Sequence, residues 1–311
     1  MTDKNARPAY VAVAVAPVSV GFMPLGDALE TACHEAGLAP QQPTRLLGTE
    51  GKWAAVEMSL DLNGVSLASA RDQLANRLGS YADWALIGSR SRRKRLLISD
   101  MDSTIIQQEC LDELADYAGL KAEIAAITER AMAGELDFEG ALTARVKMIK
   151  GLPLQSLEAC YAERITLMPG AKTLTATMAL HGAHCLLVSG GFTYFTSRVA
   201  DVAGFADHQG NTLIDNGKTL TGDVGMPILG RQAKLDALDK AASAHNLTRA
   251  DTLAMGDGAN DLAMIEAAGL GLAVHAKPVV AAAANAAINH TDLTAALYFQ
   301  GYSDSEIVQR S

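Results

Sequence analysis

Apolar positions in the first third of the chain alternate between short β-like runs and helical repeats. Asp27–Ala36 and Leu67–Leu78 carry apolar side chains at helical spacing, whereas Pro17–Leu25 contains glycine and proline and predicts a loop. Four β-rich runs predict strands, at Tyr10–Val15, Arg45–Leu47, Trp53–Met58 and Trp84–Ile87. The order strand, helix, strand, strand, helix, strand is that of a ferredoxin-like α+β unit, which we place at residues 1–89.

The remaining residues, 90–311, combine apolar strands with one block of helices. Leu96–Ile98 is a short apolar run, typical of a buried parallel strand. Residues 106–168 follow with four helical patterns, and we expect this insert to form a cap over the end of that strand. The four patterns are Glu109–Gly119, Lys121–Met132, one within Gly134–Gly151, and Ser156–Ile165.

From Pro169 onward, strands and helices alternate. The alternation comprises a strand at His184–Gly191, a helix at Phe192–Val202, a turn-rich β segment at Asn211–Asp223, a helix at 231–246, a strand, loop and helix at 251–265, and strands at Gly271–Val274 and Ala287–Asn289. Such alternation predicts an α/β fold with a doubly wound parallel sheet.

Composition and charge restrict the kinds of partner. Hydrophobic residues make up 49% and charged residues 20% of the chain, as in a folded globular protein. The net charge of −9 argues against general nucleic-acid binding, which needs a basic face. The basic run Ser89–Arg95 is brief, so we expect a solvated linker between domains in preference to a nucleic-acid patch.

Targeting signals and cysteine spacing point to one compartment. The first residues lack a basic start followed by an apolar core, and no apolar run reaches about 18 residues, so we expect neither a signal peptide nor a membrane span. The four cysteines show no CxxC spacing and are expected to be buried thiols in a reducing environment. Together these features predict a cytoplasmic protein.

Two carboxylates lie directly after the predicted strand at 96–98. Asp100 and Asp102 would repel each other unless a cation neutralised them, and Mg²⁺ suits carboxylate oxygens. Ligands of open α/β sheets bind beyond the carboxyl ends of the strands, where this pair lies. Taken alone, such a pair is more often two solvated acids in a capped turn.

Other strand ends add polar groups to the same edge of the sheet. Ser189 and Gly190 end one strand, and Asp257, Asn260 and Asp261 follow another, with Lys234 on the helix between them. Carboxylates, a hydroxyl, a lysine and glycine-rich loops suit phosphoryl transfer with Mg²⁺, in which a carboxylate can be the nucleophile. Individually, Ser189 or Asp261 could cap a helix, and Lys234 could be solvated.

The motifs DMDST, strand-end Ser-Gly, a downstream lysine and GDGAND, in this order, resemble the haloacid-dehalogenase-like phosphatases over about residues 95–289. The resemblance implies that Asp100 is the nucleophile and that Asp102 is the general acid and then the base. It implies one Mg²⁺ per active site, held by Asp100, Asp257 and the backbone carbonyl of Asp102. The same resemblance implies the remaining roles: phosphate binding by Ser189, Gly190 and Lys234, contact of Asn260 with phosphate or its surroundings, and support of the metal or of Lys234 by Asp261.

Two stretches of the cap resemble the phosphoserine phosphatases in particular, IIQQECLDELA and DFEGALTARVKMIKGLP. This resemblance implies that Glu109 faces the ammonium of the substrate and Arg145 pairs with its carboxylate, with Met132 and Phe138 as an apolar wall. The chemistry agrees, because arginine offers a bidentate fork to a carboxylate. Structural roles stay open: Glu109 could be an acid in a helix N-terminal turn, and Arg145 a surface ion pair.

The sequence therefore predicts Mg²⁺-dependent hydrolysis of O-phospho-L-serine, a small-molecule substrate, as the last step of serine biosynthesis. Alternatives are a phosphotransferase with an acceptor such as homoserine, a phosphatase for another small phosphomonoester, and an amino-acid-responsive binding module. The unit at 1–89 resembles the amino-acid-binding (ACT-like) extensions of longer family members and could form a homodimer.

Overall fold

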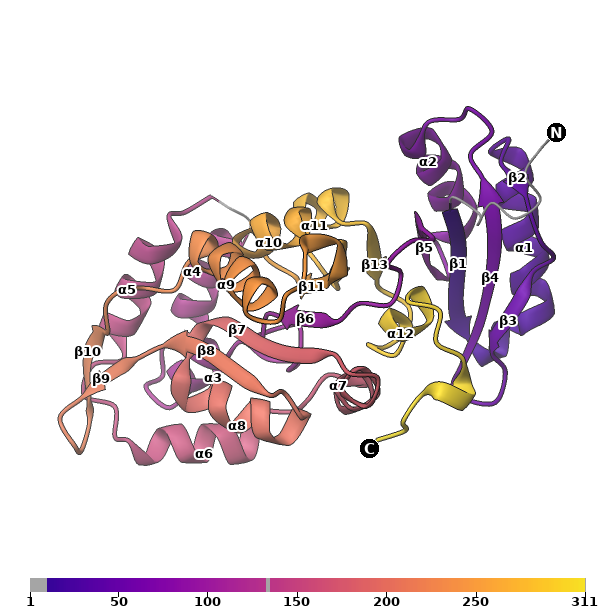
Figure 1. The fold of residues 1–311 in the computed structure, drawn as a ribbon. Helices are drawn as coiled ribbons and strands as arrows, with labels where there is room; N and C mark the ends of the chain where they lie inside the picture. The colour runs from indigo at the N-terminus through magenta and orange to yellow at the C-terminus, as the bar shows by residue number, and fades with distance from the viewer. Residues whose placement is uncertain (1–9, 133–134, 311) are drawn as a thin grey trace.

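The structure, a computed structural model, describes residues 10–132 and 135–310 and contains an 11-stranded sheet. Its order is β2-β4-β1-β5-β13-β12-β11-β6-β7-β8, with β3 also paired to β4 (Figure 1). The strands are β1 (Tyr10–Pro17), β2 (Ala39–Pro40), β3 (Arg45–Gly48), β4 (Trp53–Asp61), β5 (Asp83–Gly88), β6 (Leu96–Ser99), β7 (His184–Phe192), β8 (Asp207–Asn211), β11 (Thr252–Gly256), β12 (Leu270–Val274) and β13 (Ala286–Ile288). Strands β9 (Leu213–Asp215) and β10 (Leu220–Val224) form a separate hairpin.

Helices cover both faces of this sheet and form the inserted cap. They are α1 (Phe22–Glu35), α2 (Leu67–Leu78), α3 (Cys110–Asp116), α4 (Lys121–Met132), α5 (Phe138–Met148), α6 (Gln155–Arg164), α7 (Ala171–Leu180), α8 (Thr193–Ala203), α9 (Arg231–Ala244), α10 (Leu262–Ala267), α11 (Pro278–Ala283) and α12 (Ala295–Phe299). Short 3-10 turns lie at Val18–Val20, Arg249–Asp251, Ala259–Asp261 and Asp304–Glu306.

The part of the sheet from β13 to β8 is parallel throughout, as expected from the alternating strands and helices. Ile98 and Ala254 face α9, α10 and α11, whereas Leu97 and Met255 face α7 and α8. Both faces are covered, so β6 and β11 contain only buried residues. The predicted α/β fold with a doubly wound parallel sheet is therefore confirmed.

The N-terminal unit has the ferredoxin-like strand order β3-β4-β1-β5, with antiparallel pairing. Ala12, Ala14 and Ala16 of β1 pack toward α1 and α2, while the valines between them belong to the core on the opposite face. That opposite face is covered by α12, which packs against β1 and β5 (Figure 1). The C-terminal segment thus contributes to the core of the N-terminal unit.

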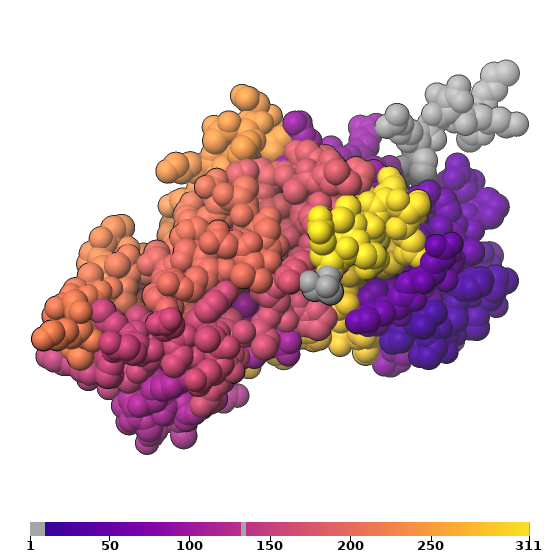
Figure 2. Space-filling view, turned by 90° about the horizontal axis from the view of Figure 1, so that it is seen from below, coloured from indigo at the N-terminus to yellow at the C-terminus, as the bar shows by residue number. Residues whose placement is uncertain are grey.

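The two parts of the molecule share hydrogen bonds and ion pairs where they meet. Strand β5 pairs antiparallel with β13 at Ala85 and Ala286, which joins the two sheets. Arg92 lies 2.6 Å from the Glu57 carboxylate and donates to the carbonyl of Phe299 at 2.8 Å. In the space-filling view the C-terminal segment lies against the N-terminal unit (Figure 2).

The basic run at 89–95 is therefore not the solvated linker that its sequence suggested. Besides Arg92, the Lys94 ammonium donates to the carbonyls of Ser91 and Ala250 and is 7% exposed as a residue. Arg93 stacks over the Tyr302 ring at 4.2 Å and pairs with Glu306. These cations satisfy carbonyls and carboxylates at the junction, so they are structural contacts.

One further expectation needed correction. Helix α1 begins at Phe22, not Asp27, because Pro24 falls in the first turn, where a missing N–H costs no helical hydrogen bond. Strand β8 and helices α7, α11 and α12 were not expected: β8 is a polar edge strand, and α11 and α12 have only six and five residues. The four cysteines are buried and free, as expected.

Helices α3–α6 form the inserted cap, and two connections tie it to the parallel sheet. The connections pair with each other through the bridge of Ile106 with Leu167 and the hydrogen bond from the Gln107 amide to the Thr166 carbonyl. Helix α5 packs against β10, so the β9–β10 hairpin extends the cap. Among the described residues, we find no helix with the length and apolar character needed to cross a membrane.

Candidate active site

Asp100 occupies the position directly after β6, at the carboxyl end of the parallel sheet. Its backbone amide donates to the Met255 carbonyl of β11, so the loop starts in register with the neighbouring strand. Its carboxylate is almost fully buried. Oδ1 accepts a hydrogen bond from the Met101 amide at 2.7 Å and lies 2.8 Å from the Lys234 ammonium. The predicted nucleophile is thus held in one orientation beside a cation.

Lys234 comes from α9 and is fully buried. Its ammonium donates to Asp261 Oδ1 at 2.6 Å, in addition to its contact with Asp100. Burial alone would lower the lysine pKa, but the two carboxylates outweigh it and raise the pKa above its usual value. Lys234 is therefore charged at any physiological pH.

Asp261 holds Lys234 in place rather than capping α10 with its side chain. Its Oδ1 binds Lys234, and its Oδ2 accepts from the Gly258 amide at 3.1 Å. Gly256 leaves room for this carboxylate, because a Cβ at that position would lie 2.4 Å from it. Of the two roles expected for Asp261, the geometry favours orientation of the lysine.

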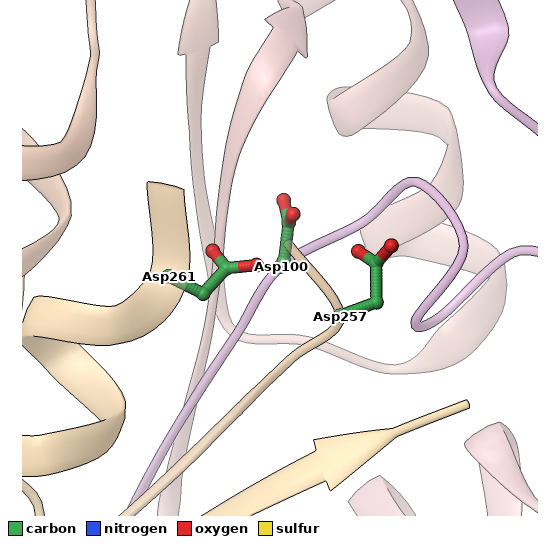
Figure 3. A group of neighbouring side chains, drawn as sticks. All are labelled: Asp100, Asp257 and Asp261. Atoms are coloured by element: carbon green, nitrogen blue, oxygen red, sulfur yellow. The ribbon is translucent and has the colours of Figure 1, made fainter. Parts of the chain in front are cut away.

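Three carboxylates gather at one point below the cap: Asp100, Asp257 and Asp261 each offer an oxygen within 4.8 Å of the others (Figure 3). The Oδ1 atom of Asp257 is buried and has no hydrogen-bond partner within the described part of the chain. Burial, and then the charges of Asp261 and Asp100, raise the Asp257 pKa well above its usual value. An unpaired buried carboxylate oxygen beside two further carboxylates fits a divalent cation such as Mg²⁺.

Asp102 follows two residues after Asp100 in the same loop, and its side chain is not part of this carboxylate group. Its Oδ1 accepts a hydrogen bond from the Cys110 amide, at the start of α3, at 3.1 Å. Burial, followed by the charge of Asp100, raises its pKa to about 7. A carboxyl group with this pKa can both donate and accept a proton near neutral pH, which suits a general acid and base.

The strand end at Ser189 provides a tight backbone approach to Asp102. The Ser189 hydroxyl accepts from the Gly191 amide at 2.8 Å, and α8 starts only at Thr193, so Ser189 is not a helix cap. A Cβ at Gly191 would lie 2.8 Å from Asp102 Oδ2 and 3.0 Å from Ser189 Oγ. Glycine is therefore required for this loop to lie against both groups.

The cap closes over this strand end. A Cβ at Gly190 would lie only 2.5 Å from the Phe138 ring, which comes from the first residue of α5. A cavity of about 20 Å³ remains between cap and sheet, room for roughly one water molecule. The structure therefore represents a closed state, and a phosphomonoester can enter only if the cap moves.

Most of the site residues predicted from the sequence line this cavity. They are Asp100, Asp102, Glu109, Phe138, Arg145, Ser189, Gly190 and Asn260. Lys234, Asp257 and Asp261 adjoin it through Asp100. Met132 was expected in the apolar wall, but its side chain lies outside the described part of the structure.

Glu109 and Arg145 line the cavity from two parts of the cap, Glu109 at the N-cap position before α3 and Arg145 within α5. The Glu109 carboxylate accepts from the Ser103 hydroxyl at 2.6 Å, and burial and then Asp102 and Asp257 raise its pKa well above the usual value. Arg145 is buried at 3% exposure on α5 and forms no ion pair closer than 4 Å with any described residue. A surface ion pair, the alternative for Arg145, is therefore wrong.

Four further lining residues were not expected: Leu111, Leu142, Gly191 and Phe192. Leu142 could have been found, since Phe138, Leu142 and Arg145 lie at i, i+4 and i+7 on one face of α5. Asn260 presents a buried Oδ1 without a partner among the described residues. A larger cavity of about 700 Å³, lined by Trp53, Leu167 and Tyr298 among others, contains none of the predicted residues.

Comparison with known proteins identifies the class. The family model described as haloacid dehalogenase-like hydrolase matches residues 97–266. A phosphoserine phosphatase of Archaeoglobus fulgidus is 40% identical over 243 residues, which cover 77% of this chain and 70% of that protein. The chain spans 63% and 60% of the length of two further phosphoserine phosphatases, of Streptomyces coelicolor and Vibrio cholerae.

Solved structures agree with this class. A haloacid dehalogenase family hydrolase of Salmonella enterica has a TM-score of 0.79 at 28% identity and covers 93% of this chain and 98% of its own. A phospho-aspartyl intermediate analogue of a phosphoserine phosphatase has a TM-score of 0.64 at 37% identity, covering 67% and 99%.

The parallel sheet, the strand-end carboxylates and the matched segment define a haloacid dehalogenase-like hydrolase. More narrowly, the chain belongs to the phosphoserine phosphatase family of these hydrolases, and it is a phosphatase.

Proposed function

We propose that this enzyme hydrolyses O-phospho-L-serine to L-serine and phosphate, with Mg²⁺ bound by Asp100 and Asp257. The convergence of Glu109 and Arg145 on one cavity with Asp100 carries this proposal. Glu109 offers a counter-charge for an ammonium group, and Arg145 offers a fork for a carboxylate. A phosphorylated amino acid presents both groups beside its phosphate.

The residues of the site divide the chemistry between two steps. In the first, a carboxylate oxygen of Asp100 attacks phosphorus, the bond from phosphorus to the serine oxygen breaks, and Asp102 gives that oxygen its proton. In the second, water attacks the phosphorus of the aspartyl phosphate, Asp102 takes the proton, and the bond to Asp100 breaks. Both steps conserve atoms and return Asp100 and Asp102 to their starting states.

Lys234 and nearby hydrogen-bond donors would stabilise the negative charge of the phosphoryl group during transfer. Lys234 is fixed by Asp100 and Asp261, beside the carboxylate that would accept the phosphoryl group, and its charge would stabilise phosphate oxygens during transfer. Ser189 and the Gly190 amide would bind other phosphate oxygens, and Asn260, which lines the same cavity, would donate to phosphate through its side-chain NH2 group. A bound Mg²⁺ would supply further neutralisation of the transferring group.

The test is phosphate release from O-phosphoserine with Mg²⁺, compared with phosphothreonine, p-nitrophenyl phosphate and phosphoethanolamine, with and without EDTA. We expect a strong preference for phosphoserine that chelation removes. Release of phosphate from all substrates alike would retain a phosphatase and reject this substrate. Adding homoserine and measuring phosphohomoserine formation would identify a phosphotransferase instead.

The wider role follows from the same proposal. Serine release of this kind is the last step of serine biosynthesis, and we place it in the cytoplasm.

We also propose a homodimer through the N-terminal unit, because Phe22, Met23 and Leu46 are exposed large apolar side chains on it. Sedimentation velocity of the full chain tests this; a monomer at micromolar concentration rejects it.

A further inference from the structure

The guanidinium of Arg145 is buried without a carboxylate in direct contact. Its Nε donates to the Ala141 carbonyl of the same helix at 3.2 Å, and its Nη1 donates to the Thr128 hydroxyl at 2.8 Å. No described residue accepts a hydrogen bond from Nη2. One edge of the guanidinium is therefore fixed by the protein, while the rest remains for a group in the cavity.

The Thr128 hydroxyl connects Arg145 to a second carboxylate. Thr128 Oγ1 donates to Asp112 Oδ1 at 2.6 Å, and Asp112, Thr128 and Arg145 are at most 9% exposed. An arginine can only donate, so the Thr128 oxygen accepts from Arg145, and its own proton is available to Asp112 at 2.6 Å or to the Ile124 carbonyl at 3.1 Å. The shorter distance and the charge of the carboxylate favour Asp112. The three side chains come from α3, α4 and α5, so this chain of bonds crosses three cap helices.

The indirect contact between Asp112 and Arg145 leaves the guanidinium free to bind a substrate carboxylate. Asp112 acts on Arg145 through a neutral hydroxyl and does not occupy the guanidinium itself. Had the carboxylate contacted Arg145 directly, it would have competed with any incoming anion for the same donors. The intervening threonine holds the arginine in place and leaves its fork available.

We propose that Asp112 and Thr128 are positioning residues that determine the specificity of this enzyme for a substrate carboxylate. They act through Arg145, whose orientation they fix toward the cavity that also contains Glu109. The inference rests on the proposed function, since it assigns how one group of the phosphoserine substrate is selected. It adds two residues that do not line the cavity and so do not contact substrate.

Asp112 and Thr128 affect substrate selection through the order that they impose on Arg145. Fixing a long side chain before binding removes the entropy that its ordering would cost on binding, which is worth roughly two- to tenfold in affinity per side chain. A loss of that size acts only on a ligand that uses the arginine. A purely structural role of the same two residues would affect every substrate equally.

The test compares O-phosphoserine with phosphoethanolamine, which keeps the phosphate and the ammonium but lacks the carboxylate. Variants are Thr128→Val, Thr128→Ser and Asp112→Asn, with Arg145→Ala as the reference for complete loss. Asp116→Asn is the matched control for Asp112→Asn. It removes one negative charge from the exposed side of α3, the helix that also contains Asp112, where Asp116 pairs with Arg164.

We expect Thr128→Val and Asp112→Asn to raise KM for phosphoserine about tenfold, with values for phosphoethanolamine within about twofold of the starting enzyme. Thr128→Ser, which keeps the hydroxyl, should retain the starting KM, as should Asp116→Asn. If Thr128→Val does not fold, Asp112→Asn and Thr128→Ser still decide the question.

Equal changes for both substrates, or no change for phosphoserine, would overturn the inference. Failure of the proposed function gives a different result: the unmodified enzyme would not prefer phosphoserine over phosphoethanolamine at all. The unmodified enzyme alone therefore tests the proposed function, and the variants then test the role of Asp112 and Thr128.

Discussion

At Lys234 a single positive charge is buried against two carboxylates, with a third beside them. Asp100, Asp257 and Asp261 together carry three negative charges if ionised, and the lysine offsets one. The remaining charge of two is that of a divalent cation. The lysine thus belongs to the permanent structure of the site, and a bound divalent cation would complete its charge balance.

Replacement of Asp100 by asparagine tests the nucleophile. The variant keeps the shape of the side chain but removes the attacking carboxylate, so we expect kcat to fall by roughly 1,000-fold or more. Its melting temperature should stay close to that of the starting enzyme, because relief of like-charge repulsion with Asp257 offsets the loss of the ion pair with Lys234. Phosphate release and thermal melting are the measurements.

The control is Asp239→Asn, which removes an exposed carboxylate paired with Arg249 on the surface. Its kcat should be unchanged. Normal activity of Asp100→Asn would remove Asp100 from the role of nucleophile.

The pKa values of the carboxylate group predict how Mg²⁺ stabilises the protein. Burial and then Asp100 raise the Asp261 pKa to about 7, and the Asp257 pKa is also raised. The folded, metal-free protein then binds more protons than the unfolded chain between about pH 4 and 7, so these groups contribute less stability as pH rises through that window.

A bound cation reverses this trend, because it needs the deprotonated carboxylates. We therefore expect MgCl₂ to raise the melting temperature more at pH 8 than at pH 5.5, with the protein first stripped by EDTA. Asp257→Asn should reduce the gain at pH 8. A gain that is the same at both pH values would contradict the assignment of these groups to the metal.

At the scale of elements, α5 carries the part of the cap that meets the sheet. Its first residue, Phe138, covers Gly190, and Arg145 lies two turns further along the same face. Phe138 and Arg145 therefore belong to one helix, so a displacement of α5 would move both side chains together. The absence of a side chain at position 190 allows α5 to lie against the strand end.

Gly190→Ala tests this contact. The added methyl would lie 2.5 Å from the Phe138 ring, so the cap must stay partly open. We expect kcat/KM for phosphoserine to fall about 100-fold, since small displacements at a site can cost that much. Adding Phe138→Ala makes room for the methyl.

The double variant should recover part of the loss relative to Gly190→Ala alone, as measured by steady-state kinetics on phosphoserine. Additive losses would show that the methyl acts on the phosphate-binding backbone and not on closure. Gly217→Ala is unsuitable as a control, because Gly217 has positive φ; Gly51→Ala, with open space around it, is suitable.

At the scale of the whole molecule, local signals predicted the strands that carry chemistry, and long-range contacts did not follow from them. β6 and β11 are apolar runs, so their ends and the acids after them could be placed from the sequence. β8, with the sequence DHQGN, is polar because it is an edge strand, and α12 is too short to show helical spacing. The meeting of β5 with β13 depends on residues two hundred positions apart, for which a single sequence offers no signal.

The cluster of site residues was predictable for the same reason. Each acid follows a recognisable strand, and parallel strands place their carboxyl ends at one edge. Asp112 and Thr128 give no such signal, because a carboxylate and a hydroxyl on cap helices are usually exposed, and only the packing of α3, α4 and α5 buries them. The junction cations at Arg92 and Lys94 were misinterpreted because their partners lie far away in the chain.

Asp83 links the N-terminal unit to the parallel sheet more tightly than any sequence pattern indicated. It is 1% exposed at the start of β5, and its carboxylate accepts from the amides of Asn289, His290 and Thr291, directly after β13. Asp83→Ala would leave these donors without a partner in a buried place. We expect a loss of about 3 kcal/mol in the free energy of unfolding, measured by urea denaturation. Asp72→Ala, at an exposed position of α2, should have almost no effect. Strands β12 and β11 separate β13 from β6, so Asp83 is set apart from the site across the sheet, and kcat of folded Asp83→Ala should be unchanged. A loss of kcat with intact stability would mean that the N-terminal unit acts on the site itself.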